Sequence, residues 1–325
     1  MTVDLVDHYT KVVKGLRNGW VVPVLGAGAN RAGRPAGKRW KVRTSHLPDG
    51  SELASYLARE FESYKGDKRD LIRVAQYIAV MGGGTGPLYQ TLHDVFDWDY
   101  QITPLHDFLA RLPGRLRDAG ILRRYPVILS TNYDDLLERA FAAADEPFDV
   151  CMYVAEGSET DKGRFYHRSP DGNVRVIAEP EEYLDLSPDR RTIILKIHGF
   201  VDRDRNNIEP KDSYVITEDH YIEYLTRTDL SQLLPPTVLR GLTERHFLFL
   251  GYSLRDWNLR AILHRFASER STTWEWWSVQ LNPDPVERKS WELRDVHIVE
   301  VDIDTYLAGL NERIDASIAK NARAR

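Results

Sequence analysis

The sequence predicts an α/β protein built on a parallel β-sheet, and two patterns carry this prediction. Short apolar runs rich in β-branched and aromatic residues recur along the chain, and most are followed by segments with helical spacing of apolar residues. Strands that are apolar along both faces are typical of a parallel sheet covered by helices on both sides. Their alternation with helices favours crossover connections, so we expect a Rossmann-like sheet of about six strands.

Six segments account for the expected strands. They are WVVPVLG (20–26), YPVILSTN (125–132), RTIILKIHG (191–199), RHFLFLGYS (245–253), TWEWWSVQL (273–281) and VHIVEVD (296–302). Helical spacing is clearest in residues 51–64, where Ser51 is the expected N-cap, in residues 133–144 and in residues 254–269. The segment MGGGTGP (81–87) lacks the Gly-Lys-Ser/Thr of a P-loop and is expected to be a hinge between helices.

We expect a single domain over residues 1–325. Its Rossmann-like core should comprise residues 20–30, 120–145, 190–200 and 245–302, with helical and lid insertions at 31–119, 146–190 and 200–244 and a C-terminal helix at 304–320. Roughly 20 residues follow the core, whereas an independent domain usually needs about 50 or more, so we expect no appended sensor domain.

The composition indicates a soluble protein of a reducing compartment. The net charge is −5 over 325 residues, which gives no electrostatic case for direct nucleic-acid binding. The single cysteine, Cys151, excludes an internal disulfide and a zinc site of several cysteines. The amino-terminal segment lacks the apolar core of a signal peptide, and the longest apolar runs are too short to span a bilayer. We therefore expect a cytoplasmic protein.

Glycines and small polar residues follow four of the expected strands. Ligands of parallel α/β sheets bind outside the carboxyl ends of the strands. At those places the chain carries Gly26–Asn30, Thr131–Asp135, His198–Gly199 and Gly251–Ser253. Their coincidence predicts a ligand site at this edge of the sheet.

The first of these places has two interpretations. Gly26 and Gly28 would let a phosphate approach the backbone, with Ala27 and Asn30 beside it. A plain tight turn between a strand and a helix would use the same residues. The third glycine of a dinucleotide-binding fingerprint is absent, because Arg31 stands at its position.

The second place, after the strand at 125–132, carries polar residues of two kinds. Asp134 or Asp135 is expected to cap the next helix, where a carboxylate is favoured by the free amides and by the helix dipole. Capping does not account for Thr131 and Asn132. We therefore expect the hydroxyl of Thr131 and the amide of Asn132 to face the ligand.

The remaining two places carry a histidine and a serine. His198 follows a buried strand and precedes a glycine, and we favour a catalytic over a structural histidine because imidazole titrates where general-base catalysis needs it. After the strand at 245–253 we expect Ser253, beside Gly251, to bond a phosphate or ribose. Asp256 is expected first as a helix cap and second as a ligand contact, together with Asn258.

Taken in chain order, these motifs resemble those of the sirtuins, and specifically the bacterial SIR2-like branch found in anti-phage defence. The matching motifs are Gly26-Ala27-Gly28, Asn132-Tyr133-Asp134, His198-Gly199 and Gly251-Tyr252-Ser253. The segments GRP (33–35), STNYDDLLE (130–138) and GYSLRDWN (251–258) add to the resemblance, which covers about residues 21–261. The sirtuin loop departs from the dinucleotide fingerprint after Gly-Ala-Gly, which explains the missing third glycine.

The chain also departs from sirtuin deacylases. Those enzymes carry four zinc-binding cysteines after the His-Gly motif, whereas Cys151 stands alone and upstream of it, so no zinc module is expected. The deacylase loop of the type PDFR is not matched by RAGRPAGKRW (31–40). The resemblance therefore implies hydrolysis of NAD⁺ at the nicotinamide–ribose bond, with NAD as substrate and water as nucleophile, and not protein deacylation.

The resemblance implies a role for each candidate residue. Asn132 would position the nicotinamide ribose or the attacking water. Asp134 would contact the carboxamide or the developing positive charge, and His198 would bond a ribose hydroxyl or act as general base. The glycine loop would hold the diphosphate. None of these roles requires a metal.

Two alternatives and several partners stay open at this point. The chain could be a non-catalytic scaffold subunit that binds NAD or ADP-ribose, or a nuclease subunit, for which Asp134 and Asp135 are the one close carboxylate pair. The resemblance implies a homo-oligomer and a partner protein such as a HerA-like ATPase or a short Argonaute, with nucleic acid bound only through that partner. Two segments are candidates for either a contact surface or the core: the amphipathic amino-terminal segment, with Leu5, Val12, Val13 and Leu16, and the edge near Trp276.

Overall fold

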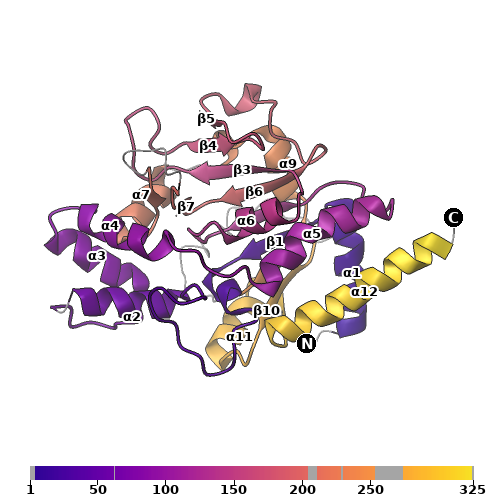
Figure 1. Cartoon of the computed structure of the whole chain (residues 1–325), viewed down its shortest axis with the longest axis horizontal. Coiled ribbons are helices and arrows are strands. Elements are labelled where there is room, and N and C mark those ends of the chain that lie inside the picture. Colours follow the sequence, from indigo (N-terminus) through magenta and orange to yellow (C-terminus); the bar gives the residue numbers. More distant parts are fainter. Residues whose placement is uncertain (1–3, 62, 204–210, 228–229, 253–273, 324–325) are drawn as a thin grey trace.

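The computed structural model describes residues 4–61, 63–203, 211–227, 230–252 and 274–323. At its centre is a nine-stranded sheet with the order β11-β10-β9-β1-β2-β6-β3-β4-β5 (Figure 1). The strands are β1 Val21–Leu25, β2 Val127–Ser130, β3 Phe148–Tyr153, β4 Phe165–Arg168, β5 Val174–Val176, β6 Thr192–Lys196, β9 His246–Leu250, β10 Trp276–Gln280 and β11 Val296–Glu300. All neighbouring pairs are parallel except β3–β4 and β4–β5, which are antiparallel. The predicted α/β class with a Rossmann-like parallel sheet is confirmed.

The sheet has more strands than the six that the sequence predicts. All six form, as β1, β2, β6, β9, β10 and β11. Residues 146–190, expected to be a lid insertion with an irregular or hairpin structure, add β3, β4 and β5, which pair antiparallel with one another and extend the main sheet. β3 is buried beside β6, although Asp149 interrupts its apolar pattern. β4 and β5 lie at the edge of the sheet. Buried and half-buried side chains alternate along β4, and the side chains of β5 are mostly exposed, so neither strand has the continuous apolar run that identifies a buried strand.

Helices cover both faces of this sheet (Figure 1). One face packs against α1 (Leu5–Asn18), α5 (Pro104–Asp118), α6 (Leu136–Ala143) and α12 (Ile303–Arg323). The other face packs against α7 (Glu218–Arg227), α9 (Pro236–Thr243) and α11 (Pro285–Glu292), with the short α8 (Leu230–Leu233) between the first two in sequence. The central strands are buried on both sides, as their apolar sequences require.

A separate helical layer lies beside the carboxyl ends of the strands. It consists of α2 (Gly50–Glu60), α3 (Leu71–Met81) and α4 (Gly86–Phe96). Its apolar cluster includes Tyr133 and Leu136, which follow β2 directly. The layer therefore rests on the edge of the sheet where the predicted ligand residues gather.

The start of α2 corrects one prediction. The N-cap is Asp49 and not Ser51, because the Asp49 carboxylate accepts the backbone N–H of Glu52 at 2.9 Å while the Glu52 carboxylate accepts the N–H of Asp49 at 3.0 Å. This reciprocal capping box satisfies two amides that Ser51, already inside the helix, would leave to solvent. The glycine-rich segment 81–87 joins α3 to α4, and Gly83 and Gly84 have positive φ there.

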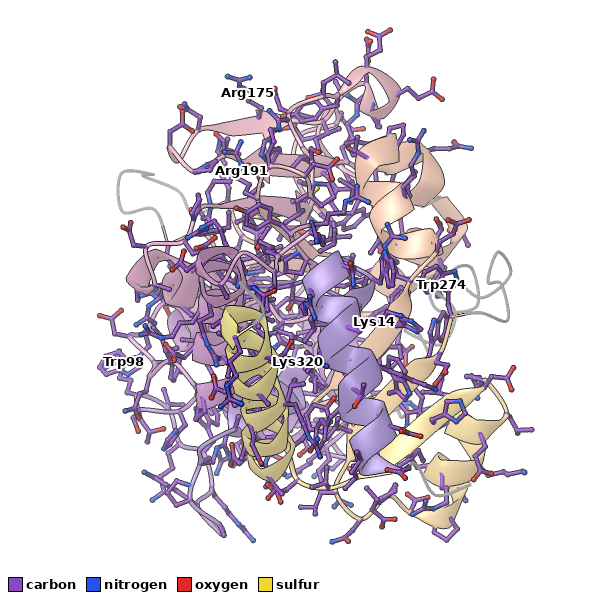
Figure 2. All side chains as sticks on the ribbon, turned by 90° about the vertical axis from the view of Figure 1, so that its right-hand side faces the viewer. Lys14, Trp98, Arg175, Arg191, Trp274 and Lys320 are labelled. Atoms are coloured by element: carbon purple, nitrogen blue, oxygen red, sulfur yellow. The ribbon has the colours of Figure 1, made fainter. Side chains whose placement is uncertain are left out.

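The predicted contact surfaces are largely core. Val12, Val13 and Leu16 of α1 are buried, because α1 packs on the sheet and against α12 (Figure 2). Trp276 of β10 is buried on the other face of the sheet, in the cluster that includes Trp291 of α11. Leu5 is 43% exposed and alone of these faces solvent. No helix in the described ranges is both long and apolar enough to cross a membrane.

Candidate functional site

The strand register aligns the four predicted motifs. Leu25 of β1 pairs with Leu250 of β9 and with Ser130 of β2, and Ser130 pairs in turn with Lys196 of β6. These residues form one row across four neighbouring parallel strands. The glycine loop, Thr131, Ile197 and Gly251 each begin at the residue after this row, so all four motifs lie at one edge of the sheet.

Asn132 and His198 hold equivalent positions at this edge. Each lies two residues beyond the paired ends of β2 and β6. The Asn132 amide donates from Nδ2 to the carbonyl of Gly26 at 3.2 Å, which ties the end of β2 to the end of β1. The ring of His198 is buried and packs edge-on against Tyr221 and Tyr224 of α7, with centroids 5.4 and 6.1 Å apart.

The loop after His198 needs a glycine. Gly199 and Phe200 form β7, which pairs antiparallel with β8 (Ser213–Tyr214). Gly199 has a φ of +94°, and a Cβ there would collide with the Ser213 carbonyl. The Val215 N–H donates to the His198 carbonyl at 2.9 Å, so the backbone around the histidine is held on both sides.

The glycine loop has a packing role that the sequence did not reveal. Its residues form a short 3₁₀ helix, η1 (Ala27–Arg31), in which the Ala29 N–H donates to the Gly26 carbonyl. The Gly28 N–H donates to the Gly251 carbonyl at 2.8 Å, and a Cβ on Gly28 would lie 2.6 Å from that oxygen. Gly28 is therefore required for contact between the loops after β1 and β9, and the Gly28 and Ala29 amides already have protein acceptors.

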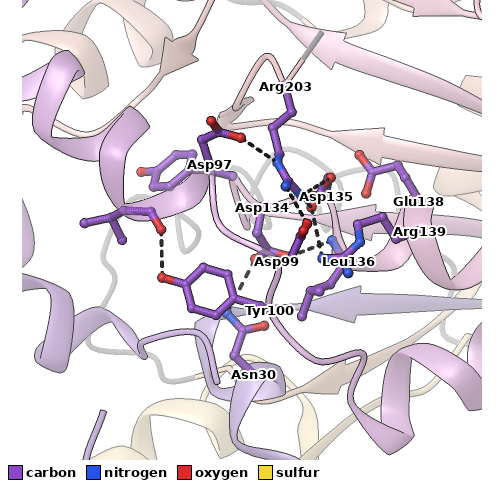
Figure 3. Close-up of polar contacts among 12 residues, drawn as sticks. Asn30, Asp97, Asp99, Tyr100, Asp134, Asp135, Leu136, Glu138, Arg139 and Arg203 are labelled. Atoms are coloured by element: carbon purple, nitrogen blue, oxygen red, sulfur yellow. Dashed lines mark hydrogen bonds and ion pairs between the residues drawn. The ribbon is translucent and has the colours of Figure 1, made fainter. Parts of the chain in front are cut away.

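Asn30 and Asp134 meet although they are far apart in sequence. The Asn30 amide is buried, and its Nδ2 lies 3.4 Å from Asp134 Oδ2 (Figure 3). The same nitrogen lies 3.4 Å from the Pro48 carbonyl. The other Asp134 oxygen accepts the N–H of Leu136 at 3.1 Å. Asp134 thus provides the predicted helix cap and still faces the loop after β1.

Asp135 has a different environment. It occupies the N-cap position of α6 without capping through its side chain, and instead accepts from Arg203 Nη1 at 2.9 Å. Arg203 also bonds Asp97 and Asp99, which follow α4, so one guanidinium joins three aspartates (Figure 3). Asp134 and Asp135 therefore contact different groups and do not form the paired carboxylates that a nuclease site would need.

Burial dominates the electrostatics of Asp134. Loss of solvent raises its pKa, while the charge of Lys196, the Leu136 N–H and Asn30 lower it and the charge of Glu138 raises it. The pKa of Asp135 is also raised, chiefly by burial and by Glu138, against the opposing charge of Arg203.

Three charged residues near the site were not predicted from the sequence: Lys196, Glu138 and Arg203. Lys196 Nζ lies 2.9 Å from Glu138 Oε1 and donates to the carbonyls of Asp134 at 2.6 Å and Tyr133 at 3.2 Å. A lysine inside an otherwise apolar strand was the available signal for the first two, because a buried charge needs a charged or hydrogen-bonding partner.

The remaining predicted residues have mixed outcomes. The Thr131 hydroxyl donates to the Leu25 carbonyl at 3.2 Å, so it fastens β2 to β1 and its proton does not face a ligand. Ser253 and Asp256, and the helix expected at 254–269, lie outside the described residues. Among the residues that the structure covers, no three His, Cys, Asp or Glu side chains gather as metal ligands would.

A cavity of about 340 Å³ lies beside the amino ends of the parallel strands, whereas the candidate site lies at their carboxyl ends. Arg191, which precedes β6, and Ser169–Asn173, which join β4 to β5, line it together with Arg175 (Figure 2). Because these residues flank the amino ends of the parallel strands, the cavity is separate from the site described above.

Comparison with known proteins identifies related sequences. A family model described as a SIR2-like domain matches residues 126–299, which run from β2 into β11 and begin after the glycine loop. Among curated proteins, the NAD(+) hydrolase ThsA of Enterococcus faecium is 29% identical over 213 residues, covering 65% of this chain and 35% of that protein.

Two further relatives carry the same name. The NAD(+) hydrolase ThsA of Acinetobacter baumannii is 27% identical over 257 residues, which are 78% of this chain and 41% of the relative. That of Bacillus cereus is 27% identical over 222 residues, which are 67% of this chain and 36% of the relative. The chain thus spans between about a third and two fifths of the length of these relatives.

Proposed function

The chain belongs to the family of SIR2-like domains, and from this premise we propose that it is an NAD⁺ hydrolase that releases nicotinamide. The observation that carries the proposal is the equivalent placement of Asn132 and His198 beyond the paired strands β2 and β6, with Asp134 between them in sequence. The name NAD(+) hydrolase, which the curated relatives carry, supports the same reaction.

The proposed reaction breaks the bond between nicotinamide N1 and ribose C1′. Water supplies the new C1′–O bond, the bonding electrons leave with nicotinamide, which becomes neutral, and one proton is released with ADP-ribose. The cationic leaving group makes positioning and stabilisation of an oxocarbenium-like centre the main requirements. An amide, a buried carboxylate and an imidazole are suited to these tasks.

We assign the roles that the motifs suggest. Asn132 positions the ribose or the water, Asp134 faces the carboxamide or the developing positive charge, and His198 bonds a ribose hydroxyl or accepts the proton of water. The diphosphate lies beside the glycine loop. The set proposed to bind NAD outside the reacting bond is Gly26, Ala27, Gly28, Asn30, Gly251, Ser253 and Asp256, and Thr131, whose hydroxyl donates to the Leu25 carbonyl, holds the end of β2 beside them.

We further propose that a single SIR2-like domain over residues 1–325 acts in the cytoplasm as an anti-phage effector that depletes NAD. Its control would come from a homo-oligomer and from a partner protein such as a HerA-like ATPase or a short Argonaute. The resemblance to the bacterial SIR2-like branch supports this proposal. Light scattering and co-purification with the neighbouring gene products test it, and a monomer that destroys NAD at full speed without a partner contradicts it.

The central experiment is incubation of the purified chain with NAD and chromatographic measurement of nicotinamide and ADP-ribose. We expect both products in equal amounts, at a low rate for the isolated chain, with and without EDTA. NAD binding by calorimetry without nicotinamide release, in the presence of the partner, would favour the scaffold alternative. Loss of activity on chelation, restored by a divalent ion, would contradict the proposed metal-free site.

A further inference from the structure

Lys196 and Glu138 form a buried ion pair directly beneath the candidate site. Lys196 is 2% exposed and Glu138 6% exposed, and their charged atoms lie 2.9 Å apart. Removing two charges from water opposes folding, and replacing such a pair with apolar side chains is often neutral or stabilising. Stability alone therefore gives no reason for charged residues at these positions.

The lysine directs its remaining donors at the turn after β2. An ammonium has three N–H groups. One donates to Glu138, and the other two donate to the carbonyls of Tyr133 and Asp134. All three N–H groups of Lys196 thus have acceptors, and two of these hydrogen bonds hold the backbone of the segment that carries Asn132 and Asp134.

The same lysine belongs to the strand that carries His198. Lys196 ends β6, pairs in register with Ser130 and precedes His198 by two residues. Its side chain therefore links the ends of β2 and β6 beyond the last paired residues, where the backbone ladder between the two strands stops. Glu138, in the first turn of α6, fixes the direction of the ammonium from the other side.

We propose that Lys196 and Glu138 are positioning residues, which hold the Asn132–Asp134 turn in place relative to His198 for NAD⁺ hydrolysis. This inference rests on the proposed function. Neither residue needs to touch NAD: Lys196 acts through two backbone carbonyls, and Glu138 acts through Lys196. A misplacement of catalytic groups by about 1 Å can cost on the order of a hundredfold in rate, so a fixed turn matters for turnover.

The charges around Asp134 add a second consequence. Lys196 from β6, Glu138 from α6, the neutral Asn30 from η1 and the neighbouring Asp135 with its partner Arg203 surround that carboxyl group; Arg168 of β4 lies 3.8 Å from Glu138. Lys196 keeps the pKa of Asp134 lower than burial alone would set it. Loss of its charge should therefore shift the acidic limb of the pH profile to higher pH.

The test compares Lys196→Met with the double variant Lys196→Met/Glu138→Leu. The single variant leaves Glu138 buried without its lysine, so we expect a lower melting temperature and a lower kcat. In the double variant both charges are gone, and we expect the melting temperature to recover. Its kcat should stay at least ~10-fold below wild type with KM within about twofold, since the turn still lacks its donor.

The pH profile of kcat is a second readout of the same variants. Its acidic limb should shift to higher pH in the single variant, and by a smaller amount in the double variant, which also loses the repulsion from Glu138.

Arg117→Met is the matched control. Arg117 pairs with the buried Glu146 at 2.6 Å, and both residues lie toward the amino ends of β2 and β3, away from the site. This variant should lose stability without a change in kcat.

Two results for the Lys196→Met/Glu138→Leu variant would overturn the inference. A wild-type kcat, or a failure to fold, would mean that the pair serves folding alone. A wild-type chain that releases no nicotinamide under any condition would instead overturn the proposed function.

Discussion

At the scale of single residues, Asp134 combines a local and a long-range contact in one side chain. One oxygen caps the first amide of α6, and the other lies beside Asn30 from the loop after β1. A surface helix cap would have one of these contacts and an ordinary pKa. Here the carboxyl group is buried, and burial raises its pKa, so its protonation can be followed through the pH dependence of the site.

The activity should depend on the protonation of Asp134. Burial raises the pKa of this carboxyl group, and the proposed role near a developing positive charge needs the ionised form. We therefore expect kcat to fall as the pH decreases through a pKa above the ordinary value for aspartate. The measurement is kcat for nicotinamide release against pH, with Asp134→Asn expected to be slow and to lack this acidic limb. An unchanged profile in that variant would remove Asp134 from the mechanism.

Asn132→Ala and His198→Ala test the two equivalent strand-end positions. Loss of a positioned acid–base or orienting group typically costs ~10²–10⁴-fold in rate, and we expect a loss of that size in each variant. Asn132→Ala also loses the bond to the Gly26 carbonyl, so its melting temperature should fall slightly. Nicotinamide release and thermal melting are measured together. Near wild-type turnover in both variants would contradict the assignment of the site.

At the scale of elements, the loops after β1 and β9 form one unit. Gly28 and Gly251 contact each other through a backbone hydrogen bond, and Gly251 has a φ of +66° with Ala29 packed against it. Because β1 lies between β9 and β2, this unit stands where the chain order reverses across the sheet, which is the usual ligand position in open α/β folds. Its glycines are needed for that close packing whether or not a diphosphate binds.

Gly28→Val should therefore destabilise the protein as well as weaken NAD binding. The new Cβ would lie 2.6 Å from the Gly251 carbonyl, and overpacking of this kind costs ~1–3 kcal/mol. Gly50→Val is the control, because Gly50 has an ordinary φ and a Cβ added there would meet no atom within 4 Å. We expect a lower melting temperature and weaker NAD binding by calorimetry only for Gly28→Val. Unchanged stability in that variant would show that the two loops can separate freely.

At the scale of the whole molecule, two buried histidines lie in the outer helices α1 and α5. His8 of α1 lies 2.8 Å from the Tyr306 hydroxyl of α12, and His106 of α5 lies 2.7 Å from the Thr103 hydroxyl. Burial is the main cause that lowers the pKa of each imidazole from 6.5 to about 4. Both are neutral in the folded protein at neutral pH.

The folded state should therefore lose stability between pH 6.5 and about 4. In this window the unfolded chain binds protons at His8 and His106 that the folded chain does not, so the free energy of unfolding falls as the pH falls. One pKa unit corresponds to about 1.4 kcal/mol, which gives an effect of roughly 3 kcal/mol for each histidine. The raised pKa of Asp134 acts in the opposite direction and over part of the same range.

Denaturant unfolding at a series of pH values measures this effect. His8→Gln and His106→Gln should each flatten the dependence between pH 6.5 and 4, whatever their stability at pH 7. His46→Gln is a control, because His46 is only partly buried and burial lowers its pKa less than it lowers those of the other two. Equal slopes in all variants would assign the acid sensitivity to other groups.

The sequence by itself determined the strands that carry the site and the order of their motifs. β1, β2, β6 and β9 are largely continuous apolar runs, and the glycines, Asn132, Asp134 and His198 follow them directly. Both features depend on neighbouring residues only, which is why hydrophobic pattern and turn chemistry sufficed to predict them. The edge strands β4 and β5 lack that pattern, because part of each faces solvent.

Only the tertiary structure decided which residues meet. The row from Leu250 through Leu25 and Ser130 to Lys196 depends on strand order and register, which no local pattern specifies. The contacts of Asn30 with Asp134 and of Lys196 with Glu138 join residues 104 and 58 positions apart, and both follow from that register. The same closeness adds a packing requirement at Gly28, and it gives the buried lysine the partners that make its burial tolerable.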